Sequence, residues 1–310
     1  MKVIYMGTPD FSVPPLEKLI ENGYDVCLVV TQPDKEKGRG REVSMSPVKM
    51  CALKHNIPVF QPVKIREEEA VKTLRSYGAD IFVVAAFGQI VSEEILNMPK
   101  YGCINIHASL LPKYRGAAPI QWSILDGEEY TGVTIMKMAK GVDTGDIYSS
   151  TKVKIEDDET GDSLFDKLTL VGADLLIDTL PKIEDGSLAP IPQDEALATH
   201  TSKISKELGL IDWNKEASVI ERYIRGLNSW PSAYTYLDKK TLKIWRAKVV
   251  DITTKKNVKG SVIEVKKDSF TVSTGDYGIE ILEIQLEGKK RMRVHDFLLG
   301  YKIEVGTILG

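Results

Sequence analysis

The sequence lacks the features that mark secreted, membrane and disulfide-rich proteins. It contains only three cysteines, Cys27, Cys51 and Cys103, which are far apart and in no metal-ligand pattern, so we expect a reducing compartment and no structural disulfide. No apolar run approaches the roughly 20 residues that cross a bilayer. Residues 1–7 are too short an apolar stretch for a signal peptide and precede no small-residue cleavage site. We therefore expect a cytoplasmic protein with no membrane partner.

Motifs for dinucleotides and metal ions are also missing. Residues 6–11, Met-Gly-Thr-Pro-Asp-Phe, follow the first expected strand but do not contain the G-x-G-x-x-G pattern of dinucleotide-binding turns. No pair of histidines has the spacing of metal ligands on a helix or a hairpin. The sequence therefore disfavours a nicotinamide cofactor and predicts no metal ion.

Charge is distributed unevenly along the chain, although the net charge is only −3. Residues 208–310 carry 18 Lys or Arg against 13 Asp or Glu, whereas residues 1–207 carry 23 against 31. A basic C-terminal part is compatible with a polyanionic partner. Ordinary variation of surface charge is the alternative explanation.

The 310 residues are enough for two domains, and the two halves have different patterns. In the first half, short apolar segments rich in Val and Ile alternate with segments of helical spacing, which predicts an α/β domain with a mostly parallel sheet covered on both faces. Functional residues then belong at the carboxyl ends of the strands. The expected strands are residues 2–6, 25–31, 58–60, 80–85 and 103–107, and the expected helices are residues 13–21, 46–55, 67–77 and 161–180.

The second half begins with a stretch that mixes Gly, Pro, Asp and Ser, which is typical of a linker. Closely spaced short strands then predict a small β-barrel or sandwich. We expect a first domain at residues 1–184, a linker at 185–207 and a smaller β domain at 208–310. The expected helix of this part is residues 217–227, and the expected strands are residues 233–237, 243–249, 260–265, 269–274, 278–285 and 291–294.

The strand at residues 103–107, Cys-Ile-Asn-Ile-His, carries the clearest chemical signal. Alternate side chains of a strand share one face, so Asn105 and His107 project together while Ile104 and Ile106 face the opposite side. An amide can donate a hydrogen bond to a developing oxyanion, and an imidazole can move a proton or stabilise charge near neutral pH. A buried histidine satisfied by the backbone is the alternative; the aligned asparagine favours a catalytic pair.

A second candidate is Asp143, which lies between Gly141 and Gly145. Flanking glycines allow a loop to bend sharply and to approach a ligand closely. A carboxylate there could orient His107 or accept a proton through water. An ordinary Asp-Gly turn between strands is the alternative, and it would be preferred if the Asn105–His107 pair were not present.

These segments resemble the methionyl-tRNA formyltransferases, a family within the wider formyltetrahydrofolate-using superfamily. The resemblance covers nearly the whole chain, and its C-terminal motifs separate this family from the rest of the superfamily. The motifs are residues 7–11 (Gly-Thr-Pro-Asp-Phe), 31–34 (Thr-Gln-Pro-Asp), 106–112 (Ile-His-Ala-Ser-Leu-Leu-Pro), 114–122 (Tyr-Arg-Gly-Ala-Ala-Pro-Ile-Gln-Trp), 143–146 (Asp-Thr-Gly-Asp), 211–213 (Ile-Asp-Trp) and 224–231 (Ile-Arg-Gly-Leu-Asn-Ser-Trp-Pro).

The resemblance implies a Rossmann-like catalytic domain, an OB-like C-terminal barrel and a catalytic trio of Asn105, His107 and Asp143. It implies formyl transfer from 10-formyltetrahydrofolate to methionyl-initiator-tRNA, by a protein that we expect to be a monomer. The residues that match the family's folate-binding segments are Phe87, Gly88, Gln89 and Ile90, together with Ser109, Leu110, Leu111 and Pro112.

Residues 33–45 form a basic, Gly-rich insertion that is too polar to be core. Its composition fits equally a solvated surface loop and a loop that orders on a nucleic acid. The family resemblance favours contact with the tRNA acceptor stem, with Arg39 as the best single candidate. The basic residues concerned are Lys35, Lys37, Arg39 and Arg41.

Three other functions would explain part of the same sequence features. A formyltransferase acting on a nucleotide-sugar amine would use the same trio, although the basic insertion and the basic C-terminal part argue against it. A hydrolase that releases formate from formyltetrahydrofolate would use water as the nucleophile. A non-catalytic RNA-binding protein would not need the Asn105–His107 strand or the Gly-flanked Asp143.

Overall fold

The computed structural model describes residues 1–37 and 42–310 and divides the chain into two compact units. The N-terminal unit comprises Met1–Pro119, Tyr130–Lys154 and Phe165–Thr201; the C-terminal unit comprises Ile120–Glu129, Ile155–Leu164 and Ser202–Gly310. Among the described residues, no helix is both long and apolar enough to cross a membrane.

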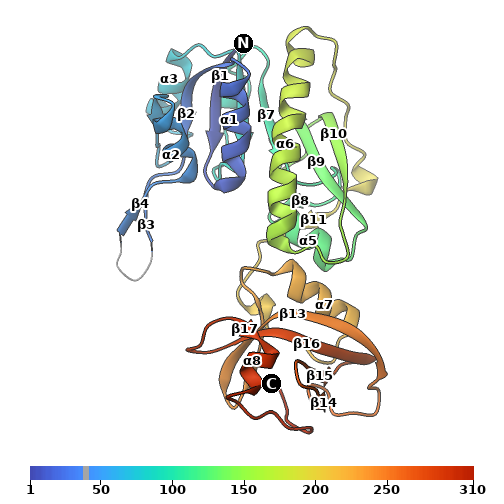
Figure 1. The fold of residues 1–310 in the computed structure, drawn as a ribbon. Helices are drawn as coiled ribbons and strands as arrows, with labels where there is room; N and C mark the ends of the chain where they lie inside the picture. The colour runs from blue at the N-terminus through green and yellow to red at the C-terminus, as the bar shows by residue number, and fades with distance from the viewer. Residues whose placement is uncertain (38–41) are drawn as a thin grey trace. The chain divides into compact units, whose positions relative to one another are not determined.

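The N-terminal unit is built on a seven-stranded sheet of order β10-β9-β7-β6-β1-β2-β5 (Figure 1). The five strands from β7 to β5 are parallel, and β9 and β10 extend the sheet beyond β7 as an antiparallel pair. Read in chain order, the parallel strands have the 3-2-1-4-5 arrangement of a Rossmann-like sheet. The strands are β1 Lys2–Gly7, β2 Asp25–Val30, β5 Val59–Phe60, β6 Ile81–Ala85, β7 Cys103–His107, β9 Tyr130–Lys137 and β10 Ile147–Lys154.

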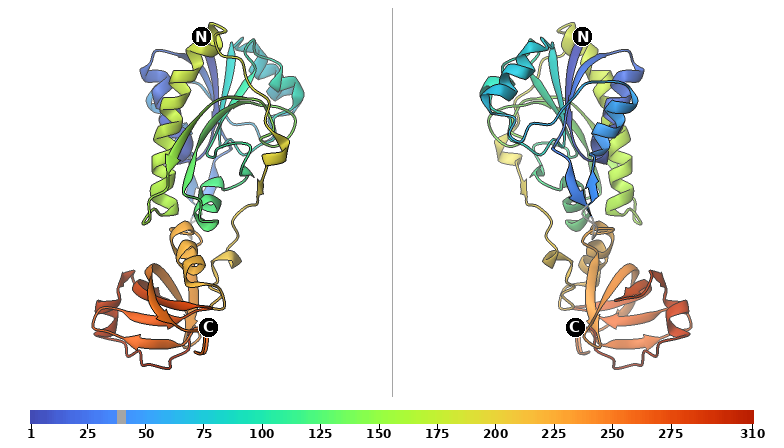
Figure 2. Two further views of the ribbon diagram at one scale, coloured as in Figure 1. Left: turned by 90° about the vertical axis from the view of Figure 1, so that its right-hand side faces the viewer. Right: turned by 90° about the vertical axis from the view of Figure 1, so that its left-hand side faces the viewer.

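Helices cover both faces of this sheet (Figure 2). One face packs on α3 and α4 through a cluster that includes Met6, Leu74 and Cys103. The opposite face packs on α6, where Gly172 comes so close to Ile106 that an added Cβ atom would lie 3.0 Å from the isoleucine side chain. The helices are α1 Val13–Glu21, α2 Pro47–Lys54, α3 Glu68–Ser76, α4 Glu93–Leu96 and α6 Gly161–Glu184, with the short η1 at Asp10–Ser12.

Smaller pieces complete the N-terminal unit. The hairpin of β3 Lys35–Lys37 and β4 Glu42–Ser44 follows β2. The short strand β8 Arg115–Gly116 pairs in parallel with β11 His200–Thr201. Residues 185–201, whose composition predicted a linker, therefore belong to the N-terminal unit because their backbone and side chains bond to residues 112–147.

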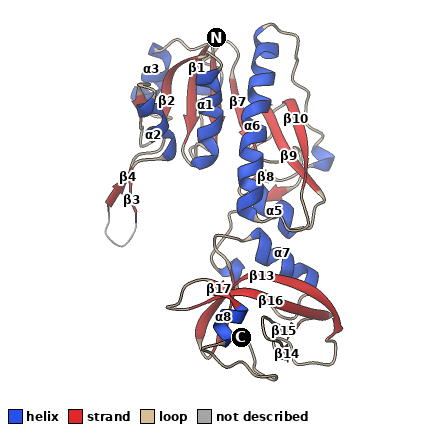
Figure 3. Cartoon of the chain, in the orientation of Figure 1, coloured by secondary structure: helices blue, strands red, loops and turns tan. Residues whose placement is uncertain are grey.

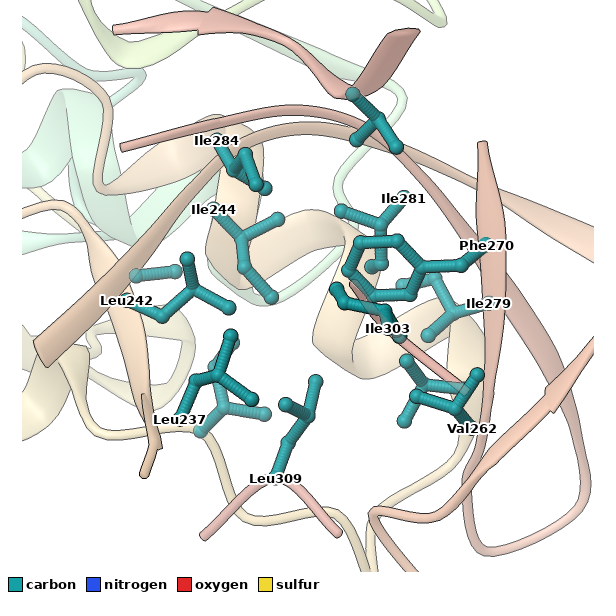
Figure 4. Close-up of a cluster of buried hydrophobic side chains, with 14 of the residues drawn as sticks. Leu237, Leu242, Ile244, Val262, Phe270, Ile279, Ile281, Ile284, Ile303 and Leu309 are labelled. Atoms are coloured by element: carbon teal, nitrogen blue, oxygen red, sulfur yellow. The ribbon is translucent and has the colours of Figure 1, made fainter. Parts of the chain in front are cut away.

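The C-terminal unit contains a separate antiparallel sheet of order β12-β13-β16-β15-β14, with β17 paired to β16 (Figure 3). Its core is formed by Ile, Leu, Val and Phe side chains that alternate along these strands (Figure 4). Ile220 and Ile224 of α7 belong to the same cluster. The elements are β12 Ala233–Leu237, β13 Lys240–Thr253, β14 Val262–Val265, β15 Phe270–Ser273, β16 Tyr277–Leu286, β17 Met292–Arg293, α5 Pro119–Leu125, α7 Ala217–Gly226, α8 Val294–Leu298 and η3 Glu207–Gly209.

The predicted fold class is confirmed: an α/β unit with a mostly parallel Rossmann-like sheet precedes a smaller β unit. The predicted helices and strands agree with the structure to within a few residues, except that Val294 begins α8 and β13 is longer than expected. The antiparallel strands β9 and β10 were not predicted. Residues 131–136, Thr-Gly-Val-Thr-Ile-Met, do carry a β-branched signal that indicates a strand.

A buried carboxylate stabilises the C-terminal sheet. Glu280 of β16 is only 5% exposed. It accepts a hydrogen bond from Ser269 Oγ at 2.6 Å and pairs with Lys248 and Lys266 at 2.9 and 3.2 Å. Burial on its own would raise the pKa of Glu280, but the hydrogen bonds from Ser269, Lys248 and Lys266 lower it from 4.5 to about 2.

We expect Glu280→Gln to destabilise the protein at pH 7 and to lose most of this effect at low pH. Because the folded pKa lies below the unfolded value, ionised Glu280 stabilises the fold above pH 4.5, and this contribution is lost as the pH falls from 4.5 to about 2. Urea unfolding of both proteins at several pH values measures it. The exposed Glu21→Gln is the control, and an equal destabilisation at pH 7 and pH 2.5 would contradict the account.

Candidate active site

Strand β7 presents Asn105 and His107 on one face of the sheet. Cys103, two residues before Asn105, packs into the cluster beneath α4, while Ile106 faces α6. Asn105 pairs with Val84 of β6 and Met136 of β9. Among the described residues, none forms a hydrogen bond with the Asn105 carboxamide, which is half-buried and therefore available to a ligand.

His107 is held at both nitrogens. The ring is 6% exposed, and its Nε2 lies 2.9 Å from the Tyr114 carbonyl oxygen. Because a carbonyl only accepts hydrogen bonds, Nε2 must carry the hydrogen. Nδ1 then faces the Asp143 carboxylate, with Oδ2 at 3.6 Å. The imidazole is thus oriented by one carbonyl and one carboxylate from different segments.

Asp143 lies in the loop that joins β9 to β10. Its φ of 52° is in the left-handed region, which Asp and Asn tolerate better than most residues. Its Oδ2 accepts a hydrogen bond from the Gly116 N–H at 2.9 Å. Two residues later, only glycine fits, because a Cβ atom on Gly145 would lie 1.7 Å from the Lys137 carbonyl oxygen. The structure therefore brings Asp143 close to His107, and His107 lies on the same strand as Asn105.

The segment Ser109–Pro112 is held firmly beside this pair. Thr134 of β9 donates from Oγ1 to the Ser109 carbonyl at 2.7 Å and accepts from the Leu111 N–H at 3.2 Å. The Ser109 hydroxyl donates to the Lys113 carbonyl at 2.7 Å. The Ser109 side chain therefore serves its own loop, and half-buried Leu110 is the more accessible side chain of the two.

The other predicted folate segment, residues 87–90, follows β6. The Phe87 side chain is 2% exposed and belongs to the core. The Gln89 carboxamide bonds to the Ile65 N–H and the Pro62 carbonyl. A ligand on this segment would therefore meet the backbone near Gly88 (φ 83°) and the exposed Ile90 side chain.

The predicted tRNA-binding residues lie on or between β3 and β4. Lys35 is exposed. Lys37 is the last residue of β3, and its backbone lies opposite that of Glu42 in the strand register. Arg39 and Arg41 lie outside the described residues. At the base of the hairpin, Lys49 forms an ion pair with Asp34 at 2.5 Å.

Within residues 1–37 and 42–310, one group of side chains has ligand types that could hold a metal ion. Glu17 of α1 and Cys51 of α2 have ligand atoms within 4.8 Å of each other and of His55. Cys51 and His55 have helical i, i+4 spacing, a signal that sequence reasoning overlooked. Burial, and secondarily the charge of Glu17, raises the pKa of the Cys51 thiol to about 11.

One cavity of the N-terminal unit is separate from the Asn105–His107 face. It has a volume of about 620 Å³ and lies among α1, α2 and α6, with Val13, Met50, Phe165 and Leu170 in its wall. Ile106 faces α6, so this cavity lies on the side of the sheet opposite to Asn105 and His107.

Sequence reasoning missed two residues that support the site. Arg115 was included in a motif without a role, and Gln193 was placed in the linker. In the structure Arg115 is 1% exposed, and Gln193 bonds to the loop that carries Asp143. No local pattern signals either contact, because 78 residues separate the two.

An amide, an imidazole and a carboxylate at a Rossmann-like sheet are groups that can stabilise an oxyanion and move protons during transfer of an acyl group to a nucleophile. Residues 1–180 match the family described as Formyl transferase, and residues 203–302 match Formyl transferase, C-terminal domain. The chain belongs to the formyl transferase family.

Its similarity to curated proteins extends over the full length. It is 57% identical to the Methionyl-tRNA formyltransferase of Agathobacter rectalis over 99% of both chains, and 52% identical to that of Lachnospira eligens over 100% of both. Among solved structures, a sugar 3N-formyl transferase solved with dTDP and 5-N-formyl-THF has a TM-score of 0.67 at 22% identity, over 94% of this chain and 99% of its own. That likeness concerns the fold.

If Asn105 donates to the oxyanion of a transferred acyl group, Asn105→Ala should lower kcat by about 10²–10³, the usual cost of one oxyanion donor. The KM for the acceptor should stay nearly constant, because the interaction forms only in the transition state. Steady-state kinetics with the exposed Asn22→Ala as control measure both. A kcat within threefold of the unaltered protein would refute the assignment.

Proposed function

We propose that this protein transfers the formyl group of 10-formyltetrahydrofolate to the α-amino group of methionyl-initiator-tRNA, which gives N-formylmethionyl-tRNA for translation initiation. The observation that carries the proposal is the 57% identity to a Methionyl-tRNA formyltransferase over 99% of both chains, which includes the C-terminal unit. We place the protein in the cytoplasm, where charged tRNA is used, and propose that it acts as a monomer without a metal ion.

In the proposed reaction, the neutral methionyl amine attacks the formyl carbon bound to N10 of the folate. A tetrahedral oxyanion forms. Asn105 donates a hydrogen bond to it, and the protonated ring of His107 stabilises it through its positive charge. The intermediate collapses when the bond between the formyl carbon and N10 breaks. One proton leaves the attacking amine and one reaches N10, so tetrahydrofolate departs neutral at that nitrogen.

Asp143 has the role of orienting His107 and of helping to remove the amine proton. Its Oδ2 lies 3.6 Å from His107 Nδ1, a separation that allows a direct interaction once the ring is protonated or a bridge through water. A covalent enzyme intermediate is not needed, because the acceptor amine is itself the nucleophile.

The same proposal assigns roles to the other parts of the chain. The catalytic domain, expected at residues 1–184, also includes residues 185–201, which belong to the N-terminal unit. The tRNA-binding domain is residues 208–310. The folate contacts the segments 87–90 and 109–112, through Phe87, Gly88, Gln89, Ile90, Ser109, Leu110, Leu111 and Pro112. The acceptor stem contacts Lys35, Lys37, Arg39 and Arg41.

The test is an acceptor assay with purified protein and 10-formyltetrahydrofolate. Methionine-charged initiator tRNA, uncharged tRNA and a nucleotide amino sugar are offered in parallel, and formate release is followed in each. Formylation of the charged tRNA alone is the expected result. Formylation of the amino sugar, or formate release without any acceptor product, would overturn the proposed acceptor.

We expect Arg39→Ala to raise the KM for methionyl-tRNA about tenfold, which corresponds to the loss of one charged hydrogen bond, with kcat nearly unchanged. Because phosphate contacts release counterions, the salt dependence of binding should also weaken by about one unit of the log–log slope. Kinetics at several salt concentrations measure both effects, with the exposed Arg66→Ala as control. A kcat defect at constant KM would contradict this role.

A further inference from the structure

The loop that carries Asp143 has to fold back across the sheet to reach His107. Strand β9 is antiparallel to β7, so it ends beside the start of β7: Lys137 pairs with Ile104, and the Met138 N–H bonds to the Cys103 carbonyl at 2.8 Å. His107 is four residues further along β7, roughly 13 Å away at 3.3 Å per residue. A loop that returns over this distance needs anchors.

Gln193 supplies an anchor from the opposite side of the loop. Its Nε2 donates to the Asp143 carbonyl at 2.9 Å and to the Gly145 carbonyl at 2.6 Å. Both N–H groups of the carboxamide are therefore used on the two residues that flank Thr144. These bonds stabilise Asp143 in its left-handed conformation, which a free loop would not favour.

Arg115 determines which way the Gln193 carboxamide points. Its Nε and Nη2 both donate to Gln193 Oε1, at 3.0 and 2.9 Å. Since a guanidinium can only donate, the oxygen of the carboxamide must face Arg115 and the NH₂ group must face the loop. Glu195 holds the other edge of the guanidinium through two bonds of 2.9 and 2.7 Å. The orientation of Gln193 is thus determined chemically.

The backbone on either side of Arg115 provides hydrogen-bond partners for His107 and Asp143. The Tyr114 carbonyl accepts from His107 Nε2, and the Gly116 N–H donates to Asp143 Oδ2. The strand pairing of β8 with β11 fixes this backbone, and a Cβ atom on Gly116 would lie 2.6 Å from the Thr201 carbonyl oxygen. One short segment therefore orients the imidazole, the carboxylate and, through Gln193, the loop.

We propose that Gln193, oriented by Arg115, is a positioning residue for formyl transfer that holds the Asp143 carboxylate against His107. This inference rests on the proposed roles of Asp143 and His107. Gln193 touches neither substrate; it acts through the Asp143 loop. Displacement of a catalytic group by about 1 Å can cost roughly 10²-fold in rate, which sets the scale expected when this anchor is removed.

The experiment is a double-mutant cycle of Gln193→Leu and Asp143→Ala. We expect Gln193→Leu alone to lower kcat about 10²-fold, with KM values for the formyl donor and the acceptor within threefold. In the Asp143→Ala background the same change should lower kcat less than threefold further, because the group that it positions is already gone. A merely structural role would instead give additive losses in the two backgrounds, and that result would overturn the inference.

Two further variants separate positioning from folding. Gln193→Glu keeps an acceptor for Arg115 but replaces the NH₂ donor by a carboxylate oxygen facing two carbonyls, so it should be as defective as Gln193→Leu. Asn22→Leu removes an exposed carboxamide that also donates to a carbonyl, that of Lys18 at 2.8 Å, and should keep full activity. Gln193→Glu with unaltered kcat would overturn the inference. The cycle is measured on whichever reaction the unaltered protein catalyses, so an absence of tRNA formylation would count against the proposed acceptor and not against Gln193.

Discussion

The hydrogen bond between His107 Nε2 and the Tyr114 carbonyl oxygen, at 2.9 Å, is the constraint on which the candidate site depends. It assigns the hydrogen to Nε2 and leaves Nδ1 to face Asp143. The bond joins the end of β7 to the turn before β8, so the ring orientation depends on that turn. Residues 199–201 hold that turn in place: the Thr199 hydroxyl accepts a hydrogen bond from the Tyr114 N–H at 2.8 Å. The chemistry of one imidazole therefore requires segments more than 80 residues apart.

The antiparallel strands β9 and β10 provide contacts to the candidate site that the parallel part of the Rossmann-like sheet does not provide. Thr134 of β9 lies beside His107 and bonds to the backbone of Ser109 and Leu111, which fixes the segment that leaves β7. The same strand pair carries the returning loop with Asp143. In a purely parallel sheet, the strand after β7 would end at the same edge as His107, and the loop that follows it would not have to return along the sheet.

Local patterns predicted the parts of this architecture that depend on local physics. Alternation along a strand was sufficient to place Asn105 and His107 on one face, and the five parallel strands were located by their Val and Ile runs. The contact of Gln193 with Asp143 spans 50 residues and depends on which loops meet, which no periodicity encodes. Residues 185–201 are rich in polar side chains, and this composition is typical of a linker. In the structure, the polar side chains of Gln193 and Glu195 instead form hydrogen bonds with Arg115 inside the N-terminal unit.

The trio leaves the choice of acceptor to other residues. Asn105, His107 and Asp143 would act on the formyl group and on the attacking amine, and any primary amine delivered to that point presents the same atoms. The fold alone does not determine the acceptor. Selectivity for a charged tRNA must then come from groups that contact the nucleic acid away from the reacting carbon. Such contacts contribute to binding in the ground state and the transition state alike, which is why their loss should change KM, whereas loss of Asn105 or Gln193 should change kcat.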